Sequence, residues 1–592
     1  MANLDLTYYH GEDHYSDGDE TENRLLEIVR SGQILDDLPM EEVSWPVLYH
    51  LHPVRENICN WYPFRKGSRV LEIGSGCGAV TGALCQSGCE VWSVELSKRR
   101  ATINYERNKD YDCLHIMVGN LNEMNFDAPF DYVVLIGVLE YAGKYTEGSD
   151  PWKTFLNNIR NYLKADGKLL VAIENLLGLK YFAGANEDHL GKPFAGLSGY
   201  KPTAGVRTFS KRELKELLKN SGFSYVNFFY PYPDYKFPLE IYSEKGMERF
   251  RYGKEYYPVD EPRFALFPEN HVNRIMIREG IGGKFANSFL AEASVSDANA
   301  DEEESIVYVK PNNDRSKAFR VGTKIRRAEG NSLEALKYAR SEQAREHLQK
   351  IQANEELMGQ YMPVLMGKET PEGLAYPIIS DPSADEKLTD LLNAKDKEGI
   401  LKLFDDIHQM MEIHPEEAEY HSSQFTRWFG DAETAQKAML CVQPANIDMI
   451  LDNLFIRDES YIVLDCEWVV DFPVPLAFVM WRVLVSALHY HPDLEQIPGR
   501  KELMHRYHIS AEDENAFSAW SEYFEKNYVG NRSLSRFSKG TRMVTLDQKK
   551  MDWLEARVEQ LEAELQSFYD SFTCKAIRKL RRTLLPGKNR QR

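Results

Sequence analysis

Cysteines are few in this 592-residue chain, and their spacing suits neither a zinc site nor a disulfide scaffold. The eight occur without any paired Cys-x-x-Cys spacing, at Cys59, Cys77, Cys85, Cys89, Cys113, Cys441, Cys466 and Cys574. Zinc sites usually need paired spacing, and disulfide scaffolds need a much higher cysteine density. A reducing compartment such as the cytoplasm is therefore the simplest expectation.

Long apolar runs are also missing, since no run approaches the ~20 residues of a membrane span. The longest candidate, 475–488, is interrupted by Arg482. The amino terminus is acidic and lacks the basic and then apolar layout of a secretory signal. Both absences favour a cytoplasmic protein.

Basic residues are fewer than acidic ones, with 72 Lys and Arg against 91 Asp and Glu, and the formal net charge is −19. Such a balance argues against general nucleic-acid binding. Hydrophobic residues make up 43% of the chain and aromatic residues 12%, which indicates a folded protein. At ~100–200 residues per domain, the length predicts three or four units.

The stretch 70–78, Val-Leu-Glu-Ile-Gly-Ser-Gly-Cys-Gly, predicts a buried strand, a tight turn and the start of a helix. Glycines at 74, 76 and 78 remove Cβ atoms where the backbone bends sharply or touches a ligand. The segment 79–84 has helical composition. By itself this glycine pattern fits any nucleotide-binding α/β fold.

Further strands follow in alternation with helices. The run 90–95 predicts a second strand that ends at Glu95, whose carboxylate suits paired ribose hydroxyls. Strands are expected at 115–120, ending at the amide of Asn120, at 130–137 and at 168–173, with a helix over 152–163. Two final strands, 223–230 and 287–295, complete an α/β sheet of the Rossmann-like kind.

With these units in order, the chain resembles the class I S-adenosylmethionine-dependent methyltransferases. The resemblance implies that Glu72 and the glycines Gly74, Gly76 and Gly78 form the first cofactor motif. It makes Glu95 the ribose-binding acid and Asn120 the adenine-side residue, where the family usually has Asp. Val138 begins Val-Leu-Glu-Tyr, which borders the transferred methyl group in that family. A nucleotide fold without methyl transfer is the alternative.

Residues 1–66 predict an arm and two helices that cover the cofactor, near 22–29 and 45–61. The arm is either a solvated terminus or a segment that folds over the cofactor and buries Tyr8, Tyr9 and Tyr15. Arg55 lies on the second helix. In related methyltransferases such a helix covers the methionine end of the cofactor, where Arg55 could pair with the carboxylate; solvation at the surface is the other interpretation.

The loop after the fifth strand concentrates Glu187, Asp188 and His189 beside aromatic residues. Doubly wound sheets place their substrates at this edge. We expect His189 to act as a general base, or to hold a phosphate or hydroxyl, with Glu187 orienting it. A hydrogen-bonded loop without chemistry is the alternative.

An acidic linker at 296–305 separates a methyltransferase domain, 67–295, from a second domain at 306–543. Asp448, Asn453 and Asp465 have the spacing of phosphoryl-transfer sites, where one carboxylate accepts the hydroxyl proton and the other two groups hold magnesium. This α+β domain resembles the protein-kinase-like fold, nearest to the aminoglycoside and choline kinases. The resemblance implies ATP and Mg²⁺ as ligands and Lys337 as the phosphate-binding lysine, with Glu342 or Glu346 as its helix partner.

Two departures keep another interpretation open. Asn446 stands where that family usually has His, and the loop 311–317 lacks a glycine-rich pattern. The second domain is therefore either an active kinase or a module that binds a glycan, a nucleotide or a glycosyltransferase without turnover. A chance occurrence of the three residues in so acidic a chain is the remaining explanation.

The carboxyl end changes character once more. Apolar residues four and three apart predict a coiled coil over 544–574, and the alternative is an amphipathic helix docked on the second domain. Residues 575–592 form a basic tail with an apolar side and no acidic residue. Such a tail favours an anionic membrane surface or an acidic partner, at ~1 kcal/mol per basic residue near a charged membrane, over a solvated end.

The order of methyltransferase, kinase-like domain, coiled coil and basic tail is similar to that of the bacterial bifunctional O-antigen chain-terminating methyltransferase/kinases. That resemblance implies a glycan or phospho-glycan acceptor, a homo-oligomer, and a glycosyltransferase partner bound through the carboxyl-terminal helix. It also implies peripheral association with the inner face of the cell membrane. A methyltransferase of small molecules or proteins, with an accessory domain, is a third interpretation.

Overall fold

The structure is a computed structural model. It describes residues 1–11, 16–33, 35, 38–249, 263–296, 306–313, 315–328, 332–418, 420–430, 438–530, 537, 543–545 and 548–570. Below, the first half means the described residues up to 296, and the second half means those from 306 to 530.

One large mixed sheet carries the first half. Its first eight strands lie in the order β1 (Asn3–Asp5), β4 (Leu114–Val118), β3 (Glu90–Glu95), β2 (Arg69–Ile73), β5 (Phe130–Ile136), β6 (Leu163–Glu174), β10 (Ser288–Ser294) and β7 (Tyr225–Tyr232). Neighbours from β1 to β6 are parallel, and β10 is antiparallel to both β6 and β7. This confirms the Rossmann-like sheet and its two final strands, which are antiparallel to one another.

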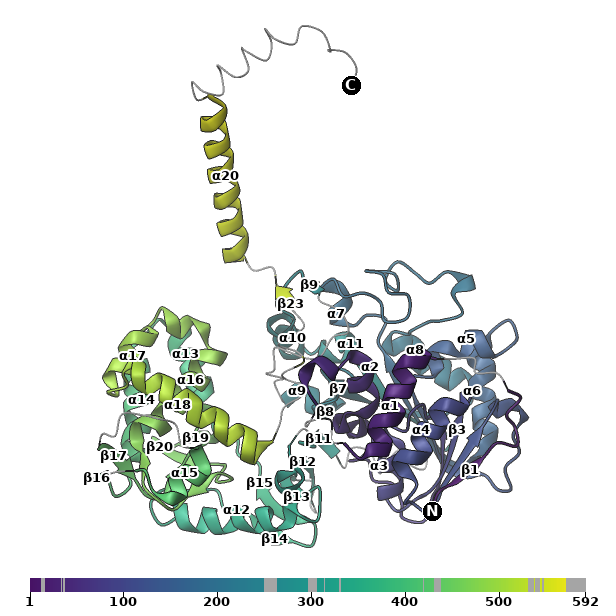
Figure 1. Ribbon diagram of the computed structural model, residues 1–592, viewed down its shortest axis with the longest axis horizontal. Coiled ribbons are helices and arrows are strands. Elements are labelled where there is room, and N and C mark those ends of the chain that lie inside the picture. Colours follow the sequence, from purple (N-terminus) through teal and green to yellow (C-terminus); the bar gives the residue numbers. More distant parts are fainter. Residues whose placement is uncertain are drawn as a thin grey trace.

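Helices cover both faces of this sheet (Figure 1). They are α1 (Asp19–Ser31), α2 (Trp45–Leu51), α3 (Thr81–Gln86), α4 (Lys98–Asn108), α5 (Ala142–Tyr145), α6 (Pro151–Tyr162), α7 (Leu179–Phe182), α8 (Lys211–Asn220), α9 (Glu244–Arg249), α10 (Glu269–Arg278) and α11 (Gly282–Phe285). Short 3₁₀ turns lie at Met40–Glu42, Pro53–Ile58, Leu121–Glu123, Leu139–Tyr141 and Pro202–Ala204.

The run at 70–73 forms a central strand because its side chains alternate between two apolar layers. Val70 packs in the layer that contains α3 and α4 residues, whereas Leu71 and Ile73 pack in the layer of α6 and α8. Strands buried on both faces read as nearly continuous apolar runs, as this one does. Glu72 is the exception in the run, and it is 3% exposed.

Local sequence explains how two of these helices begin or end. Ser210 and Glu213 form a capping box that starts α8. The helix expected over 45–61 ends instead at Leu51, and a 3₁₀ turn follows from Pro53 to Ile58. Proline has no N–H to continue the helical hydrogen bonds, and it forces the preceding residue, His52, into an extended conformation.

The sheet does not stop at the predicted linker, of which residues 297–305 lie outside the described part. After β7 it continues through β8 (Glu240–Ser243), β11 (Ile306–Lys310), β12 (Val321–Arg327), β13 (Leu333–Ala339), β15 (Gly373–Pro377) and β14 (Lys368–Thr370). All of these pairs are antiparallel. Because β11 pairs with β8, backbone hydrogen bonds join the two halves (Figure 1).

The second half is otherwise mainly helical. Its helices are α12 (Ala344–Met358), α13 (Ala384–Asn393), α14 (Lys397–Met411), α15 (Ser423–Phe429), α16 (Leu476–Tyr490), α17 (Arg500–Arg506) and α18 (Ala511–Phe524). Short strand pairs link β16 (Glu416–Ala418), β17 (Met439–Val442) and β22 (Val474–Pro475), then β18 (Ala445–Asn446) with β21 (Val469–Val470), and β19 (Leu454–Arg457) with β20 (Ser460–Val463). A separate apolar core, with Phe404, Trp520 and Phe517 fully buried, holds these helices together.

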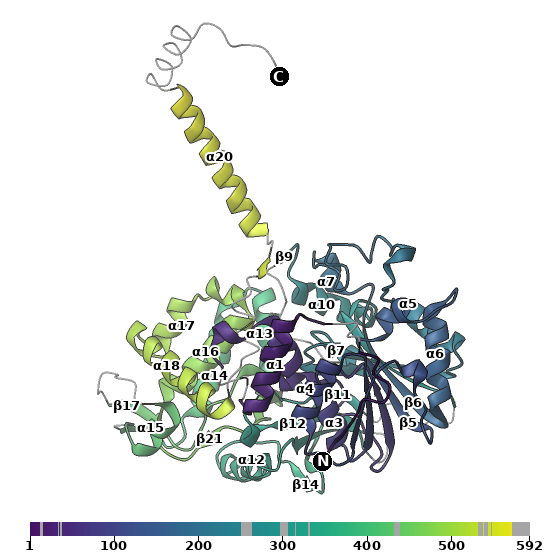
Figure 2. The same ribbon diagram turned by 45° about the vertical axis from the view of Figure 1, so that its right-hand side comes forward.

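Helix α20 (Gln548–Asp570) stands away from the body in both views (Figures 1 and 2). Just before it, β23 (Met543–Thr545) pairs with β9 (Arg263–Ala265) of the first half. Val558, Leu561 and Leu565 of α20 are about half exposed, in the positions that the coiled-coil pattern predicts for a seam. Self-association through this helix stays a prediction, and the basic tail at 575–592 lies outside the described residues.

Among the described helices, none combines the length and the apolar character that crossing a bilayer requires.

Candidate active site

A cavity of about 700 Å³ opens where the parallel strands of the first half end. Residues at or just after the carboxyl ends of β2, β3, β4, β5 and β6 line it, including Gly74, Glu95, Asn120, Val138 and Glu174. Doubly wound sheets bind ligands at this edge, at the point where the strand order reverses. Here β2 is that point, with β3 on one side and β5 on the other.

The glycine turn follows the carboxyl end of β2 and forms part of the cavity wall. Gly74, Gly76 and Gly78 all have positive φ, a region that side chains disfavour. A Cβ at Gly74 would lie 2.7 Å from Val138 Cγ2, and one at Gly78 would lie 2.2 Å from Asn104 Oδ1. Gly76 and Gly74 line the cavity, whereas Gly78 supports the turn from behind.

Glu95 ends β3 inside the cavity, where the sequence predicts a ribose-binding acid. Its carboxylate accepts hydrogen bonds from the backbone N–H groups of Gly76 at 2.8 Å and Ser97 at 2.9 Å. Burial raises the pKa of this carboxyl group, and these N–H groups oppose the shift. Each carboxylate oxygen has a second lone pair, so the fixed Glu95 can still accept from two hydroxyls.

Glu72 also lines the cavity, but side-chain hydroxyl groups hold its carboxylate, whereas backbone N–H groups hold that of Glu95. Its Oε2 accepts from Thr81 Oγ1 at 2.7 Å and from Ser93 Oγ at 2.6 Å. Burial raises the pKa of Glu72 to about 7, against these two hydrogen bonds. Glu72 thus ties β2 to the start of α3 and to β3, so it positions the turn as well as facing the ligand space.

Asn120 follows β4 and Val138 follows β5, so the two residues lie on opposite sides of the glycine turn after β2. Asn120 Oδ1 accepts from the backbone N–H of Asn122 at 3.0 Å and caps the 3₁₀ turn there. Val138 packs against Gly74. Both residues line the cavity, as the sequence resemblance implies for an adenine-side residue and a methyl-side residue.

Arg55 reaches the cavity from the 3₁₀ turn at Pro53–Ile58, and it is only 4% exposed. Its Nη1 donates to the Lys236 carbonyl at 2.7 Å, and its guanidinium lies 4.2 Å from the centre of the Tyr49 ring. Its Nε has no hydrogen-bond partner among the described residues. The structure therefore excludes the solvated alternative for Arg55.

The amino-terminal arm also reaches the cavity. Asp17 lines it and accepts from His50 Nε2 at 2.7 Å and from Arg100. The Tyr8 carbonyl lies so close to Gly119 that a Cβ there would be 2.2 Å away. Of the arm tyrosines, Tyr15 lies outside the described residues.

His189 lies at the deep end of the cavity, and its neighbours differ from those expected. Its Nδ1 is 3.0 Å from the Tyr141 hydroxyl, and its Nε2 is 3.4 Å from Glu174 Oε2. Burial lowers the pKa of His189, but the charges of Glu174 and Glu187 raise it, with a net increase above the ordinary value.

Glu187 does not contact the His189 ring. Its Oε2 accepts from the backbone N–H groups of His189 at 3.0 Å and Leu190 at 2.7 Å, and its Oε1 accepts from the Tyr200 hydroxyl at 2.7 Å. Glu187 therefore holds the loop backbone, and Glu174 is the carboxylate that faces the imidazole. The signal for Glu174 was its place at the carboxyl end of the fifth strand of the alternation.

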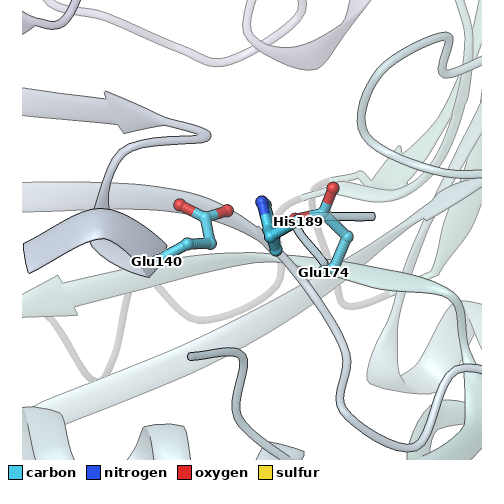
Figure 3. Close-up of side chains that lie close together, drawn as sticks. All are labelled: Glu140, Glu174 and His189. Atoms are coloured by element: carbon cyan, nitrogen blue, oxygen red, sulfur yellow. The ribbon is translucent and has the colours of Figure 1, made fainter. Parts of the chain in front are cut away.

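Glu140, Glu174 and His189 converge from three separate segments (Figure 3). One ligand atom from each lies within 4.8 Å of the others. Both glutamates are fully buried, and neither oxygen of Glu140 has a hydrogen-bond partner among the described residues. Burial and the nearby charge of Glu174 raise the pKa of Glu140 well above its ordinary value.

Two lysines extend this cluster toward the solvent side. Lys236 Nζ lies 2.6 Å from Glu174 Oε1 and also contacts Asp188. Lys180 Nζ lies 2.8 Å from Asp188 Oδ2. Burial raises the pKa of Glu174, but Lys236 and His189 lower it by more, so Glu174 is ionised.

A second group of predicted residues meets in the second half, outside the cavity. Lys337 Nζ lies 2.7 Å from Asp465 Oδ1. Asn453 Nδ2 donates to the Asp448 carbonyl at 2.9 Å. Asn446, which stands where the kinase-like family usually has His, accepts from the Asp448 N–H and donates to the Asp465 carbonyl. The structure thus brings Lys337, Asp448, Asn453 and Asp465 together.

The helix partner expected for Lys337 is not Glu342 or Glu346, because both side chains are exposed. Burial lowers the pKa of Lys337, but Asp465, Glu467 and Glu355 raise it by more. Glu355 of α12 is fully buried and accepts from the Tyr376 hydroxyl at 2.7 Å. The helix carboxylate that acts on Lys337 is therefore Glu355, more than two turns beyond the residues that the resemblance implied.

The residues of the first cavity fit the cofactor that the sequence resemblance implies. The turn leaves room for a ligand against the backbone, and Glu95 presents a carboxylate to a diol. Arg55 offers a buried donor without a partner among the described residues. In the second half, Asp465 and Asn453 offer the oxygen ligands that Mg²⁺ prefers, beside Lys337.

Residues 71–169 match the family model described as a methyltransferase domain. The match begins in β2 and ends in β6, so it includes the glycine turn, Glu95, Asn120 and Val138. No curated protein matches the chain.

Among solved structures, the chain is similar to a candidate O-methyltransferase from Nostoc punctiforme, with 15% identity over 39% of this chain and 60% of that chain and a TM-score of 0.24. It is similar to a TehB-like SAM-dependent methyltransferase from Corynebacterium glutamicum, with 14% identity over 46% and 97% of the two chains and a TM-score of 0.24. A third similar structure is phosphoethanolamine N-methyltransferase 2 from Haemonchus contortus, with 18% identity, coverage of 40% and 52%, and a TM-score of 0.25.

The first of these comparisons spans less than two thirds of the other protein's length. The family model and the position of the cavity lead to the same assignment. The chain therefore contains a methyltransferase domain, built on a Rossmann-like sheet.

Proposed function

We propose that this protein transfers a methyl group from S-adenosylmethionine to an oxygen of a phosphorylated glycan, and that its second half phosphorylates that glycan. One observation carries the methyl-transfer part. A single cavity joins the glycine turn and Glu95 to Val138 and to the Glu174–His189 cluster. Cofactor and acceptor sites are thus continuous within the methyltransferase domain.

The residues of the cavity have distinct tasks in this proposal. Glu95 accepts the ribose hydroxyls, Asn120 contacts the adenine edge and Arg55 pairs with the methionine carboxylate. The bound cofactor supplies a methyl group on a sulfonium that leaves readily. Val138 and the turn at Gly74 fix the position of that methyl group, so that the domain acts mainly through proximity and orientation.

The surroundings of His189 favour a phosphate oxygen over a sugar hydroxyl as the acceptor. A hydroxyl needs a base, whereas a phosphate oxygen carries its charge already. The charge of Glu174, whose Oε2 lies 3.4 Å from Nε2, raises the pKa of His189, which favours the protonated ring. Such a ring suits contact with an anionic group.

The second half supports phosphorylation through the grouping of Asp448, Asn453, Asp465 and Lys337. In this role Asp448 accepts the proton of the sugar hydroxyl, Lys337 contacts the phosphates of ATP, and Asn453 and Asp465 hold Mg²⁺. A bacterial surface polysaccharide is the acceptor that the order of the domains favours. The second candidate is a binding module without turnover, which the Asn446 substitution and the non-glycine loop favour.

Assembly and location complete the proposal. The exposed seam of α20 favours a homo-oligomer or a glycosyltransferase partner. The basic composition of 575–592 favours attachment at the inner membrane surface of a bacterial cell.

Cofactor binding by the full-length chain tests the methyl-transfer proposal. We expect Glu95→Ala to raise the Kd for S-adenosylmethionine about 100-fold in isothermal titration, because each hydrogen bond to a charged group contributes about 1.5–3 kcal/mol. Glu90→Ala is the matched control, since Glu90 begins the same strand at its far end. The proposal fails if the wild type has no affinity, or if Glu95→Ala binds as tightly as Glu90→Ala.

A further inference from the structure

We propose that Glu140, Glu174 and His189 form a binding site for one divalent transition-metal ion, such as Mn²⁺, at the deep end of the cavity. The three residues come from the turn after β5, the end of β6 and the loop after it. In Figure 3 the Glu140 carboxylate is directed toward the His189 ring, and Glu174 lies on the other side of that ring. Two carboxylates and one imidazole are ligands that such ions accept.

The spacing of the ligand atoms supports the site. Ligands about 2.1 Å from a metal ion lie roughly 3–4.2 Å from one another. The separation of 3.4 Å between His189 Nε2 and Glu174 Oε2 falls in that range. A Glu140 oxygen lies within 4.8 Å of both atoms, an upper bound above that range, so a shift of its side chain would complete the set. Nε2 has no hydrogen-bond partner among the described residues, so a metal ion that displaces its proton can bind there.

Residues around the three proposed ligands are placed so that they orient the ligands without binding the ion themselves. His189 Nδ1 lies 3.0 Å from the Tyr141 hydroxyl, which fixes the ring with Nε2 toward the glutamates. Metal-binding histidines commonly use their second nitrogen in this way. Lys236 contacts the other oxygen of Glu174, and leaves Oε2 on the side of the histidine.

The burial of the Glu140 carboxylate without a partner is not explained by the other residues of the site. It is fully buried, both its oxygens lack a hydrogen-bond partner, and no ion pair reaches it within the described residues. A buried polar group without a partner is costly, and a buried charge is more so. Lys236 forms its ion pairs with Glu174 and Asp188, and its charge opposes the rise in the pKa of Glu140 without forming an ion pair with it among the described residues. A bound cation would satisfy Glu140, Glu174 and His189 together.

The location gives the ion a task that rests on the proposed function. Glu174 and His189 line the cavity on the side of Val138 and Tyr141. An ion held by three protein ligands has coordination positions left for an oxygen of the acceptor. We infer that the ion binds one oxygen of an acceptor phosphate and leaves another oxygen of that group free to accept the methyl group.

Metal binding by the full-length chain tests the site without any activity assay. The chain is treated with EDTA, dialysed, and titrated with Mn²⁺ while the free ion is followed by electron paramagnetic resonance. We expect Glu140→Gln to bind one Mn²⁺ fewer per chain than the wild type. Asp465→Asn is measured beside it, because a loss confined to that variant would place the ion in the second half and overturn the proposal.

Controls separate the site from general effects. His115 and Glu90 form another histidine–glutamate pair in the same domain, with a separation of 3.7 Å, and His115→Gln should bind Mn²⁺ as the wild type does. Mn²⁺ should raise the unfolding temperature of the wild type but not that of Glu140→Gln. In EDTA, Glu140→Gln should unfold at or above the wild-type temperature, which shows that the variant is folded.

Equal Mn²⁺ binding by the wild type and Glu140→Gln would overturn the proposal and assign the cluster to proton sharing among the three residues. S-adenosylmethionine binding is measured on the same samples. A wild type that binds Mn²⁺ at this site but no S-adenosylmethionine would contradict the proposed function and leave the metal site standing.

Discussion

Asp131 at the amino edge of the methyltransferase sheet has surroundings opposite to those of Glu140 and Glu95 at the carboxyl edge. At the amino edge, Asp131 accepts from Lys164 Nζ at 2.8 Å, from Arg65 and from the Arg69 N–H at 2.9 Å. At the carboxyl edge, Glu140 has no partner among the described residues, and Glu95 is held by backbone N–H groups alone. Of these three, Asp131 is paired with cations and stabilises the fold, whereas Glu140 and Glu95 are available to a ligand. Glu174 at the carboxyl edge combines the two situations, because one of its oxygens contacts Lys236 and the other faces His189.

Two carboxylates of the second half, Asp465 and Asp448, also differ in how close a cation lies. Asp465 is paired with Lys337 at 2.7 Å, but the nearest cation to Asp448 is Arg482, at 3.8 Å. Burial raises the pKa of Asp448, and Arg482 opposes that shift. Asp448 is therefore the carboxylate without a close cation, as a general base requires, whereas Asp465 lies beside Lys337 as a ligand of Mg²⁺ would.

The largest expected effect is therefore at Asp448. We expect Asp448→Ala to lower transfer of the γ-phosphate of ATP to oligosaccharide acceptors by about 1,000-fold, because a positioned general base contributes about 10²–10⁴-fold. Affinity for S-adenosylmethionine should stay at the wild-type value, since Asp448 lies outside that cavity. Radiolabelled ATP and isothermal titration measure the two quantities.

Asp452→Ala is the control for this experiment, because Asp452 is exposed and lies in the 3₁₀ turn Leu451–Asn453, shortly after Asp448. An unchanged rate in Asp448→Ala would remove that residue from the proposed role. A wild type that binds ATP without transferring phosphate would favour the binding module.

A second pair of variants compares glycines at the two edges. Gly74 and Gly88 both have positive φ, but a Cβ at Gly74 would lie 2.7 Å from Val138, and one at Gly88 would be 3.4 Å from the flexible Lys66 side chain. We expect Gly74→Val to weaken S-adenosylmethionine binding about 100-fold, because the side chain would fill the space beside the turn. Gly88→Ala should cost about 1 kcal/mol of stability and leave binding unchanged.

Isothermal titration and urea unfolding check these two variants. Equal affinities for the cofactor would show that the turn at Gly74 is not a ligand cradle. A loss of affinity in Gly88→Ala would mean that the amino edge also shapes the cavity.

Sequence alone predicted the cofactor end of the cavity better than its deep end. Gly74, Gly76 and Glu95 lie within one strand–turn–helix–strand segment, so local spacing places them. Glu140, Glu174 and His189 come from three segments, and only their packing brings them together. For the same reason, closeness in sequence favoured Glu187 beside His189, and the kinase-like resemblance implied Glu342 or Glu346 beside Lys337, although Glu174 and Glu355 have those positions.

The continuation of the sheet into the second half was not predictable either. An acidic stretch without periodicity reads as a linker, and nothing in the sequence of 240–243 and 306–310 specifies that the two segments pair. Strand pairing between distant segments depends on the whole fold, because register and partner are set by packing on both faces. Local patterns therefore predicted the elements, but not the junction.

The smallest effect that we expect is at Asp131, and it concerns stability alone. Asp131→Asn should lower the free energy of unfolding by about 2 kcal/mol at pH 7, because buried hydrogen bonds to charged groups contribute about 1.5–3 kcal/mol. Burial raises the pKa of Asp131, but Lys164 and the Arg69 N–H lower it by more, with a net decrease below the ordinary 3.8. The difference between wild type and variant should therefore persist above pH 3.8 and shrink as the pH falls further.

Urea unfolding at several pH values measures this difference, and Asp166→Asn is the matched control. Asp166 lies 3.6 Å from the same Arg65 but is 61% exposed, so its loss should cost less than about 0.5 kcal/mol. Affinity for S-adenosylmethionine should be unchanged in both variants. If Asp131→Asn instead weakened that affinity while stability held, cation pairing would not distinguish structural carboxylates from functional ones, and the contrast between the two edges would be lost.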